Sequence, residues 1–310
     1  MKIIQRIYGG ESDIQAMIAL VRVFQKDSLH VMDLPYRFSS WAFDDPANIS
    51  IWTGEKGDVL AWAILQAPFW AIDYVCHPEV SQDLHPQILS WADHRAREVQ
   101  STPFGRPVWY INIFASKRER RREIEKAGFE SQADKGDDSW SKVWMQHAGY
   151  KTIEERASPP GFQIRPLAGQ NEVEAYVELH RAVFESKNMT REWRSRILQQ
   201  PAYRAELDLV VIAPKGRLAA FCIGWLGTDT EGKRIGQVEP MGVHQDFRAL
   251  GVGSAILTEG IKRLYQCGAD RVYVETDMHR NAALSLYKRV GFSAIEDVIV
   301  YGKEYVSAEG

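Results

Sequence analysis

The sequence predicts a mixed α/β protein made of two similar domains. The chain has 310 residues, whereas one domain usually has about 100 to 200. Runs of strand-like and helix-like hydrophobic periodicity alternate along it. Two short landmarks recur at a nearly constant offset, His77-Pro78-Glu79 with His244-Gln245-Asp246 and Gly128-Phe129 with Gly291-Phe292. We interpret this recurrence as a tandem duplication whose copies have diverged.

A break in the pattern separates the two copies. Pro159, Pro160 and Gly161 oppose the continuation of both helix and sheet. We therefore expect a first domain at 1–150, a linker at 151–161 and a second domain at 162–310.

The second domain is predicted to be a mixed, mostly antiparallel sheet flanked by helices. Pro214-Lys215-Gly216 has the turn chemistry of a hairpin, and Gly291 is a typical helix stop. The expected strands are 162–166, 207–213, 218–227, 235–243 and 271–275. The expected helices are 173–184, 190–200, 254–265 and 281–290.

The first domain repeats this order in weaker form. The expected helices are 14–25, 86–98 and a basic helix that ends at 127–129, and the expected strands are 49–52, 59–67, 72–76 and 108–114. The basic helix interleaves Glu with Lys and Arg, which favours a solvated face over a nucleic-acid patch.

Composition narrows the possible partners. The 38 Lys and Arg nearly balance the 41 Asp and Glu, so the overall charge attracts neither nucleic acid nor an anionic membrane. No window approaches the roughly 18 apolar residues of a membrane span, and we expect a cytoplasmic monomer or weak homodimer. Cys76, Cys222 and Cys267 have no ligand spacing, so we expect no disulfide framework and no metal site.

A glycine-containing turn between a strand and a helix is the strongest chemical signal. The strand that ends at Val243 is followed by Gly251 and Gly253 and then directly by a helix. Free backbone N–H groups converge at such a helix N-terminus and can hold a pyrophosphate. Glycine lets phosphate oxygens approach closely, although many Gly-x-Gly pairs are ordinary turns.

With a second motif about thirty residues later, the chain resembles the GNAT N-acetyltransferase superfamily. The family loop Arg/Gln-x-x-Gly-x-Gly/Ala is matched by Arg248 to Gly253, and the later motif of Asn, Tyr and Gly-Phe is matched by Asn281, Tyr287 and Gly291-Phe292. The resemblance covers 162–305 well, and it extends to 1–147 only through the degenerate repeat.

The resemblance implies acetyl-CoA as the donor and a primary amine, in a small molecule or a peptide, as the acceptor, joined by direct attack in a ternary complex. Asn281 either contacts acetyl-CoA or caps its helix. The residues implied to bind the pantetheine arm are Met241, Gly242 and Val243. Those implied to bind the pyrophosphate are Arg248, Ala249, Leu250, Gly251, Val252, Gly253 and Ser254.

Two catalytic residues follow from the same resemblance. Tyr287 stands where the family's Tyr donates to the departing CoA sulfur, and Glu239 is the candidate base that takes the amine proton. Side chains at 237, 239 and 241 are expected to share one face of the strand. Gln237 cannot titrate, so water is an alternative base, and His244 is a weaker candidate.

The first domain is expected to lack acetyl-CoA. The segment Ser81 to Pro86, which aligns with the phosphate loop, has no glycine, and Ile124 stands in the place of Tyr287. The leading hypothesis is therefore an N-acetyltransferase with one working domain. Its alternatives are a mycothiol-synthase-like acetyltransferase and a non-catalytic CoA-binding sensor or scaffold.

Overall fold

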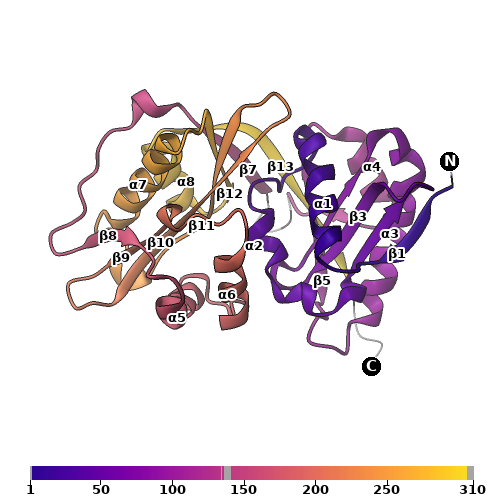
Figure 1. Cartoon of the computed structure of the whole chain (residues 1–310), viewed down its shortest axis with the longest axis horizontal. Coiled ribbons are helices and arrows are strands. Elements are labelled where there is room, and N and C mark those ends of the chain that lie inside the picture. Colours follow the sequence, from indigo (N-terminus) through magenta and orange to yellow (C-terminus); the bar gives the residue numbers. More distant parts are fainter. Residues whose placement is uncertain (1, 134, 136–140, 306–310) are drawn as a thin grey trace. The chain divides into compact units, whose positions relative to one another are not determined.

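The computed structural model describes residues 2–133, 135 and 141–305, and the chain divides into two compact units (Figure 1). The first unit comprises Met1–Lys142 and Glu296–Gly310, and the second comprises Val143–Ile295. These bounds differ from the expected 1–150 and 162–310. The reason is that the strand ending each half of the chain belongs mainly to the other unit.

The first unit contains a mostly antiparallel sheet in the order β1-β2-β3-β4-β5-β13, with β6 paired to β13. Only β4 and β5 are parallel neighbours among its recorded pairs. Its strands are β1 (Ile4–Ile7), β2 (Ile49–Thr53), β3 (Val59–Gln66), β4 (Ala71–Cys76), β5 (Val108–Phe114), β6 (Glu130–Ser131) and the C-terminal part of β13 (Phe292–Glu304). Its helices are α1 (Glu11–Val23), α2 (Leu34–Phe38), α3 (Ser81–Glu98) and α4 (Arg118–Lys126).

The side chains of β3 alternate between the two faces of the sheet, and each face packs against a different pair of helices. Ala61, Ala63 and Leu65 pack with α3 and α4, whereas Trp62 and Ile64 pack with α1 and α2. Since successive side chains of a strand point to opposite faces, one strand serves two cores. Its near-continuous apolar sequence follows from this double burial.

The second unit contains a sheet in the order β7-β12-β11-β10-β9-β8, with β13 next to β7. Its strands are β7 (Ser141–His147), β8 (Gln163–Pro166), β9 (Asp208–Ile212), β10 (Leu218–Thr228), β11 (Arg234–Val243) and β12 (Arg271–Asp277). Its helices are α5 (Val173–Phe184), α6 (Arg191–Gln199), α7 (Val252–Gln266) and α8 (Asn281–Arg289). The predicted hairpin of β9 and β10 is confirmed.

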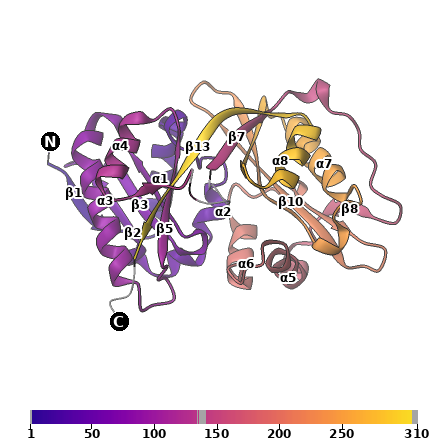
Figure 2. The same ribbon diagram turned by 180° about the vertical axis from the view of Figure 1, so that it is seen from behind.

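Helices α7 and α8 cover one face of this sheet, and α5 and α6 cover the other (Figure 2). Cys222 of β10 packs in the core beneath α7, while its neighbour Phe221 packs against Tyr176 and His180 of α5. None of the helices in the described part of the chain is long and apolar enough to cross a bilayer.

The two units repeat each other in detail. His77 accepts a hydrogen bond at Nδ1 from the backbone N–H of Glu79, over 3.2 Å, and starts a short 3-10 turn. His244 accepts the same bond from the N–H of Asp246, also over 3.2 Å. The landmark found in the sequence is therefore a repeated capping device, which explains why a histidine occurs at both places.

Two helices differ most from the sequence prediction. Helix α3 begins at Ser81 rather than Pro86, so the segment aligned with the phosphate loop is helical. A proline is tolerated early in a helix, where backbone N–H groups have no intrahelical partner. Helix α2 was not predicted, because all five of its residues are buried and show no amphipathic period.

Candidate active site

The site begins where two parallel strands separate. Among the described residues, β11 pairs with β12 from Ile235 to Gln237 alone, opposite Arg271 to Tyr273. On its other edge, β11 stays paired with β10 as far as Val243. The β12-facing edge of β11 is therefore unpaired from Val238 onward, and a ligand that supplies hydrogen-bonding groups can extend the sheet there.

A β-bulge at Glu239-Pro240 reorients the end of β11. Met241 is paired with Cys222 and Val238 with Gly224, so three steps on β11 match two on β10. The indole N–H of Trp225 donates to the Glu239 carbonyl oxygen over 2.6 Å and holds the bulge. The expectation that side chains 237, 239 and 241 share a face is wrong, because the extra residue puts Met241 on the face of Val238.

The predicted phosphate loop lies at the N-terminus of α7. Gly251 is the cap residue with φ 87°, and Ala249 also has a positive φ of 61°. The cap has no side-chain hydrogen bond, and the first backbone N–H groups of a helix have no intrahelical acceptor. The amides of Val252, Gly253 and Ser254 thus form a donor group at the positive end of the helix dipole.

Two glycines beside this loop are required by close packing. A Cβ on Gly242 would lie 2.4 Å from Val183 Cγ1, and one on Gly253 would lie 3.2 Å from Val243 Cγ2. Close contact between β11, α5 and α7 depends on both residues. At Gly251 an added Cβ would lie 3.8 Å from Pro159 Cγ, an ordinary contact, so the positive φ sets the requirement for glycine there. The residues present therefore fit a CoA pyrophosphate.

Tyr287 and Glu239 lie within electrostatic reach of each other. Tyr287 projects from α8 into the core, is 7% exposed and contacts Phe292 edge to face, with ring centroids 5.7 Å apart. Burial and then the Glu239 charge raise the pKa of its phenol above the usual value. Tyr287 is therefore protonated at neutral pH and can donate a hydrogen bond.

The charge of the half-buried Glu239 carboxylate also acts on Tyr176 of α5. Burial is the main cause of the raised pKa of Tyr176, and the Glu239 charge adds to it. The Glu239 charge thus acts on two buried phenols, Tyr287 of α8 and Tyr176 of α5.

The two remaining candidate residues are Asn281 and His244, which lie at the starts of α8 and of the turn before α7. Asn281 is the exposed first residue of α8, and the helix start has no side-chain cap hydrogen bond. Capping is therefore not its role in this structure, and a contact with the cosubstrate stays a prediction. The His244 ring contacts Arg217 and caps the turn before α7, so its engagement there makes it a poor base.

A buried charged cluster beneath α5 and α6 was missed by the sequence analysis. Arg194 and Asp208 form an ion pair with both side chains fully buried, and the Tyr203 hydroxyl donates to Asp208 over 2.8 Å. The Arg194 guanidinium lies 3.8 Å from the ring centroid of Tyr176. The sequence signal that could have revealed this cluster was Asp208, a charged residue between the apolar residues Leu207 and Leu209.

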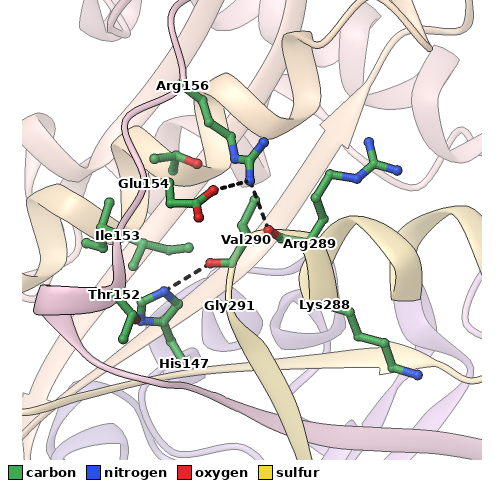
Figure 3. A pocket seen from close by; sticks show the side chains of 11 residues that line it. His147, Thr152, Ile153, Glu154, Arg156, Lys288, Arg289, Val290 and Gly291 are labelled. Atoms are coloured by element: carbon green, nitrogen blue, oxygen red, sulfur yellow. Dashed lines mark hydrogen bonds and ion pairs between the residues drawn. The ribbon is translucent and has the colours of Figure 1, made fainter.

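The pocket in Figure 3 lies toward the C-terminal ends of α7 and α8, away from the loop at the N-terminus of α7, and has a volume of about 450 Å³ with its open mouth included. Arg156 donates to Glu154 Oε2 and to the Arg289 carbonyl, each over 3.1 Å, and His147 donates to the Val290 carbonyl over 3.0 Å. These bonds fasten the segment after β7 to the end of α8, a structural role.

The counterpart region of the first unit lacks the loop. Ser81 begins α3, its hydroxyl donates to the Pro78 carbonyl over 2.8 Å, and Asp83 places a carboxylate in the first turn. Ile124 is fully buried at the place of Tyr287. Among the described residues, no three His, Cys, Asp or Glu side chains gather to hold a metal ion.

The second unit thus combines parallel strands that separate with a glycine-containing loop at a helix N-terminus. Residues 173–292 match the model of the Acetyltransferase (GNAT) family. The chain therefore carries a GNAT domain in its second unit, as the two sequence motifs predicted.

Relatives and solved structures agree with this assignment. The chain is 28% identical over 155 residues to a mycothiol acetyltransferase of Arthrobacter sp. and 29% identical over 146 residues to one of Salinispora tropica. The matches span 48% and 46% of this chain and 48% of each relative, so the chain spans about half the length of the relatives it matches.

Two solved structures resemble nearly the whole chain. A GCN5-related N-acetyltransferase from Sphaerobacter thermophilus is 18% identical with a TM-score of 0.65, over 97% of this chain and 95% of that one. A tandem GNAT protein from the clavulanic acid biosynthesis pathway is 11% identical with a TM-score of 0.64, over 99% and 100%. At such identities the likeness concerns the fold, and it confirms the predicted tandem GNAT architecture.

Proposed function

We propose that the protein is an acetyl-CoA-dependent N-acetyltransferase whose second unit is the working domain. The observation that carries the proposal is the continuity of the unpaired edge of β11 with the uncapped N-terminus of α7 through Gly251. Acetyl-CoA bound there supplies the acetyl thioester, and a primary amine is the acceptor.

Each residue has a role in this proposal. Backbone amides of Ala249 to Ser254 hold the pyrophosphate, with Arg248 beside them, and the β11 edge from Met241 to Val243 pairs with the pantetheine amides. A backbone N–H of that edge polarises the thioester carbonyl. Glu239 accepts a proton from the acceptor ammonium, which frees the neutral amine to attack the thioester carbonyl, and Tyr287 donates a hydrogen bond to the departing sulfur.

The electrostatics support the two catalytic roles. The Glu239 charge opposes ionisation of Tyr287, which keeps the phenol as a hydrogen-bond donor. A pure CoA-binding sensor needs the loop and the strand edge but neither of these groups. Their pairing next to the strand edge therefore favours the enzyme over the sensor.

A second candidate is the reaction for which the sequence relatives are named, mycothiol acetyltransferase activity. Its support is the shared half of the sequence. The first unit, with a helical turn in place of the loop, is proposed to shape or support the protein without binding acetyl-CoA.

Release of free CoA thiol, followed with a thiol reagent, tests the function. Acetyl-CoA is offered with a panel of primary amines that includes the acceptor of the mycothiol acetyltransferases. The enzyme proposal expects thiol release that depends on one acceptor class and falls in Tyr287→Phe. Acetyl-CoA binding without acceptor-dependent release would support the sensor instead.

A further inference from the structure

A buried hydroxyl of the second unit lacks a hydrogen-bond partner. Tyr176 of α5 is fully buried, and its hydroxyl forms no hydrogen bond within the described part of the chain. Buried polar groups of folded proteins are nearly always satisfied, either by protein atoms or by an internal water. The surroundings of this hydroxyl therefore indicate a bound group that joins it to other polar atoms.

The ring of Tyr176 is held from two directions. The Arg194 guanidinium lies 3.8 Å from its centroid, and the centroid of the Phe221 ring lies 5.2 Å from it. Arg194 belongs to the fully buried ion pair with Asp208. Because the ring cannot turn without losing these contacts, its hydroxyl stays in one place between α5 and the sheet.

The strand register places Asp208 and Glu239 on either side of one residue of β10. Ile223 is paired with Asp208 of β9 and lies opposite the bulge residues Glu239 and Pro240 of β11. Neighbouring strands are about 4.8 Å apart, so the Cα atoms of the two carboxylate residues are about 10 Å apart. One hydroxyl and one water are enough to span the space between their side chains.

Both carboxylates project from the face of the sheet that α5 and α6 cover. The residues that flank Asp208 and the bulge in the chain pack in the core beneath α7 on the other face, namely Leu207, Leu209, Val238 and Met241. Since successive side chains of a strand alternate between the two faces, Asp208 and Glu239 point the other way. The Tyr176 hydroxyl and the two carboxylates therefore share the space beneath α5.

The polar atoms in this space are left partly unsatisfied. Asp208 Oδ1, Arg194 Nε and Arg194 Nη1 are buried and form no hydrogen bond among the described residues. Burial is the main cause of the raised pKa of Tyr176, and the titratable groups that act on it are Arg194, Asp208, Glu239 and Cys222. A water has two hydrogens and two lone pairs, so one molecule can link the phenol to both carboxylates.

We propose that Tyr176 positions Glu239: its hydroxyl donates to an internal water, and this water donates to Glu239 and to Asp208 Oδ1. The bridge fixes the direction of the carboxylate that takes the acceptor proton. Its catalytic importance rests on the proposed function, whereas its existence does not. Tyr176 is fully buried, so it acts through Glu239 without touching the acceptor.

A carbon NMR titration of the side-chain carboxyl groups tests the bridge without any acceptor. The Glu239 signal is assigned by its loss in Glu239→Gln. Tyr176→Phe keeps the ring and its contact with Arg194 and removes only the hydroxyl. The pKa of Glu239 should rise by about one unit in this variant, because a hydrogen bond to a carboxylate favours its charged form.

Tyr265→Phe is the matched control, since its phenol is bonded to His147 elsewhere in the same unit, and it should leave the pKa of Glu239 unchanged. Denaturant unfolding gives a second measurement. Loss of a bridged hydroxyl should lower the midpoint, whereas removal of a hydroxyl that has no partner should raise it. An unchanged pKa of Glu239, or a raised midpoint, in Tyr176→Phe would overturn the proposal.

Turnover separates positioning from packing. Tyr176→Phe should lower turnover by about tenfold or more and change the acetyl-CoA dissociation constant little. In the Glu239→Gln background the same change should have no further effect, because Tyr176 acts through Glu239. Losses that multiply in the double variant would contradict the positioning role. No thiol release by the unaltered protein with any amine would instead contradict the proposed function, and the NMR titration would then decide on the bridge.

Discussion

His147 and Lys303 occupy equivalent positions in the two units, although they come from opposite halves of the chain. His147 Nε2 donates to the Val290 carbonyl over 3.0 Å, and Lys303 Nζ donates to the Ala127 carbonyl over 2.8 Å. Each carbonyl lies at the end of a helix, just before the glycine that reverses the chain. A side chain from the other half therefore fastens the last helix of each unit.

The relationship shows that the two halves exchange their final strands. β13 pairs with β5 from Val298 to Glu304 in the first unit, while Val143 and Met145 of β7 belong to the core of the second. A cut within the expected linker 151–161 would therefore remove a core strand from each unit. We therefore expect that neither half folds independently when the chain is cut there.

We predict one acetyl-CoA per chain. The second unit offers uncapped amides after Gly251, whereas the matching segment of the first unit is helical and carries a carboxylate. Calorimetric titration should give a stoichiometry near one. Two equivalent sites would contradict our interpretation of Ser81 to Pro86.

Gly251→Val should abolish acetyl-CoA binding. The side chain would cover amides that face the pyrophosphate, and φ of 87° is costly for a residue with a Cβ, by about 1 to 2 kcal/mol. Gly216→Val is the matched control, because Gly216 has φ of 81° and open space in the hairpin turn. The control should lose similar stability and keep its affinity. Wild-type affinity in a folded Gly251→Val protein would remove the loop from the site.

Tyr287→Phe should reduce turnover by about 10²-fold or more while changing the acetyl-CoA dissociation constant little. The hydroxyl matters as the sulfur gains charge, which is a transition-state interaction. Tyr265→Phe, which removes a phenol bonded to His147 in the same unit, serves as the control and should keep turnover. Unchanged turnover in Tyr287→Phe would assign this tyrosine to packing alone.

Glu239→Gln keeps size and most hydrogen bonds but cannot accept the ammonium proton. We expect turnover to fall by about 10² to 10⁴. The deficit should shrink as pH rises toward the pKa of the amine, since more acceptor then arrives neutral. A pH–rate profile of both proteins measures this. A deficit uniform across pH would mean that Glu239 orients the ammonium, and no deficit would leave water as the base.

Asp208→Asn should destabilise the second unit by about 3 to 5 kcal/mol, because it leaves the fully buried Arg194 charge without its partner. Glu259→Gln removes the same type of charge from a partly exposed pair with Arg263 and should cost about 1 kcal/mol or less. Denaturant unfolding of both variants gives the comparison. Equal losses of unfolding free energy in the two variants would show that burial does not determine the cost of breaking the Arg194–Asp208 pair.

Local signals predicted much of the fold and the loop. The hairpin around Pro214 to Gly216, the helix after Gly251 and the stop at Gly291 depend on residues within a few positions of each other, and all three were predicted correctly. The helical state of Ser81 to Pro86 was not predicted, because the sequence pattern treats a proline as the end of a helix. In the first turns of a helix, however, a proline destabilises the helix little.

The sequence by itself predicted the tandem GNAT architecture and the glycine loop, and it proposed Glu239 and Tyr287 as catalytic residues, because each of these inferences depends on short-range spacing or on motifs of fixed length. Only the tertiary structure decided the strand exchange, the bulge that separates Met241 from the face of Gln237, and the buried cluster around Arg194. These features join residues far apart in the chain, such as Lys303 and Ala127, and their stability comes from burial and pairing that no local pattern records.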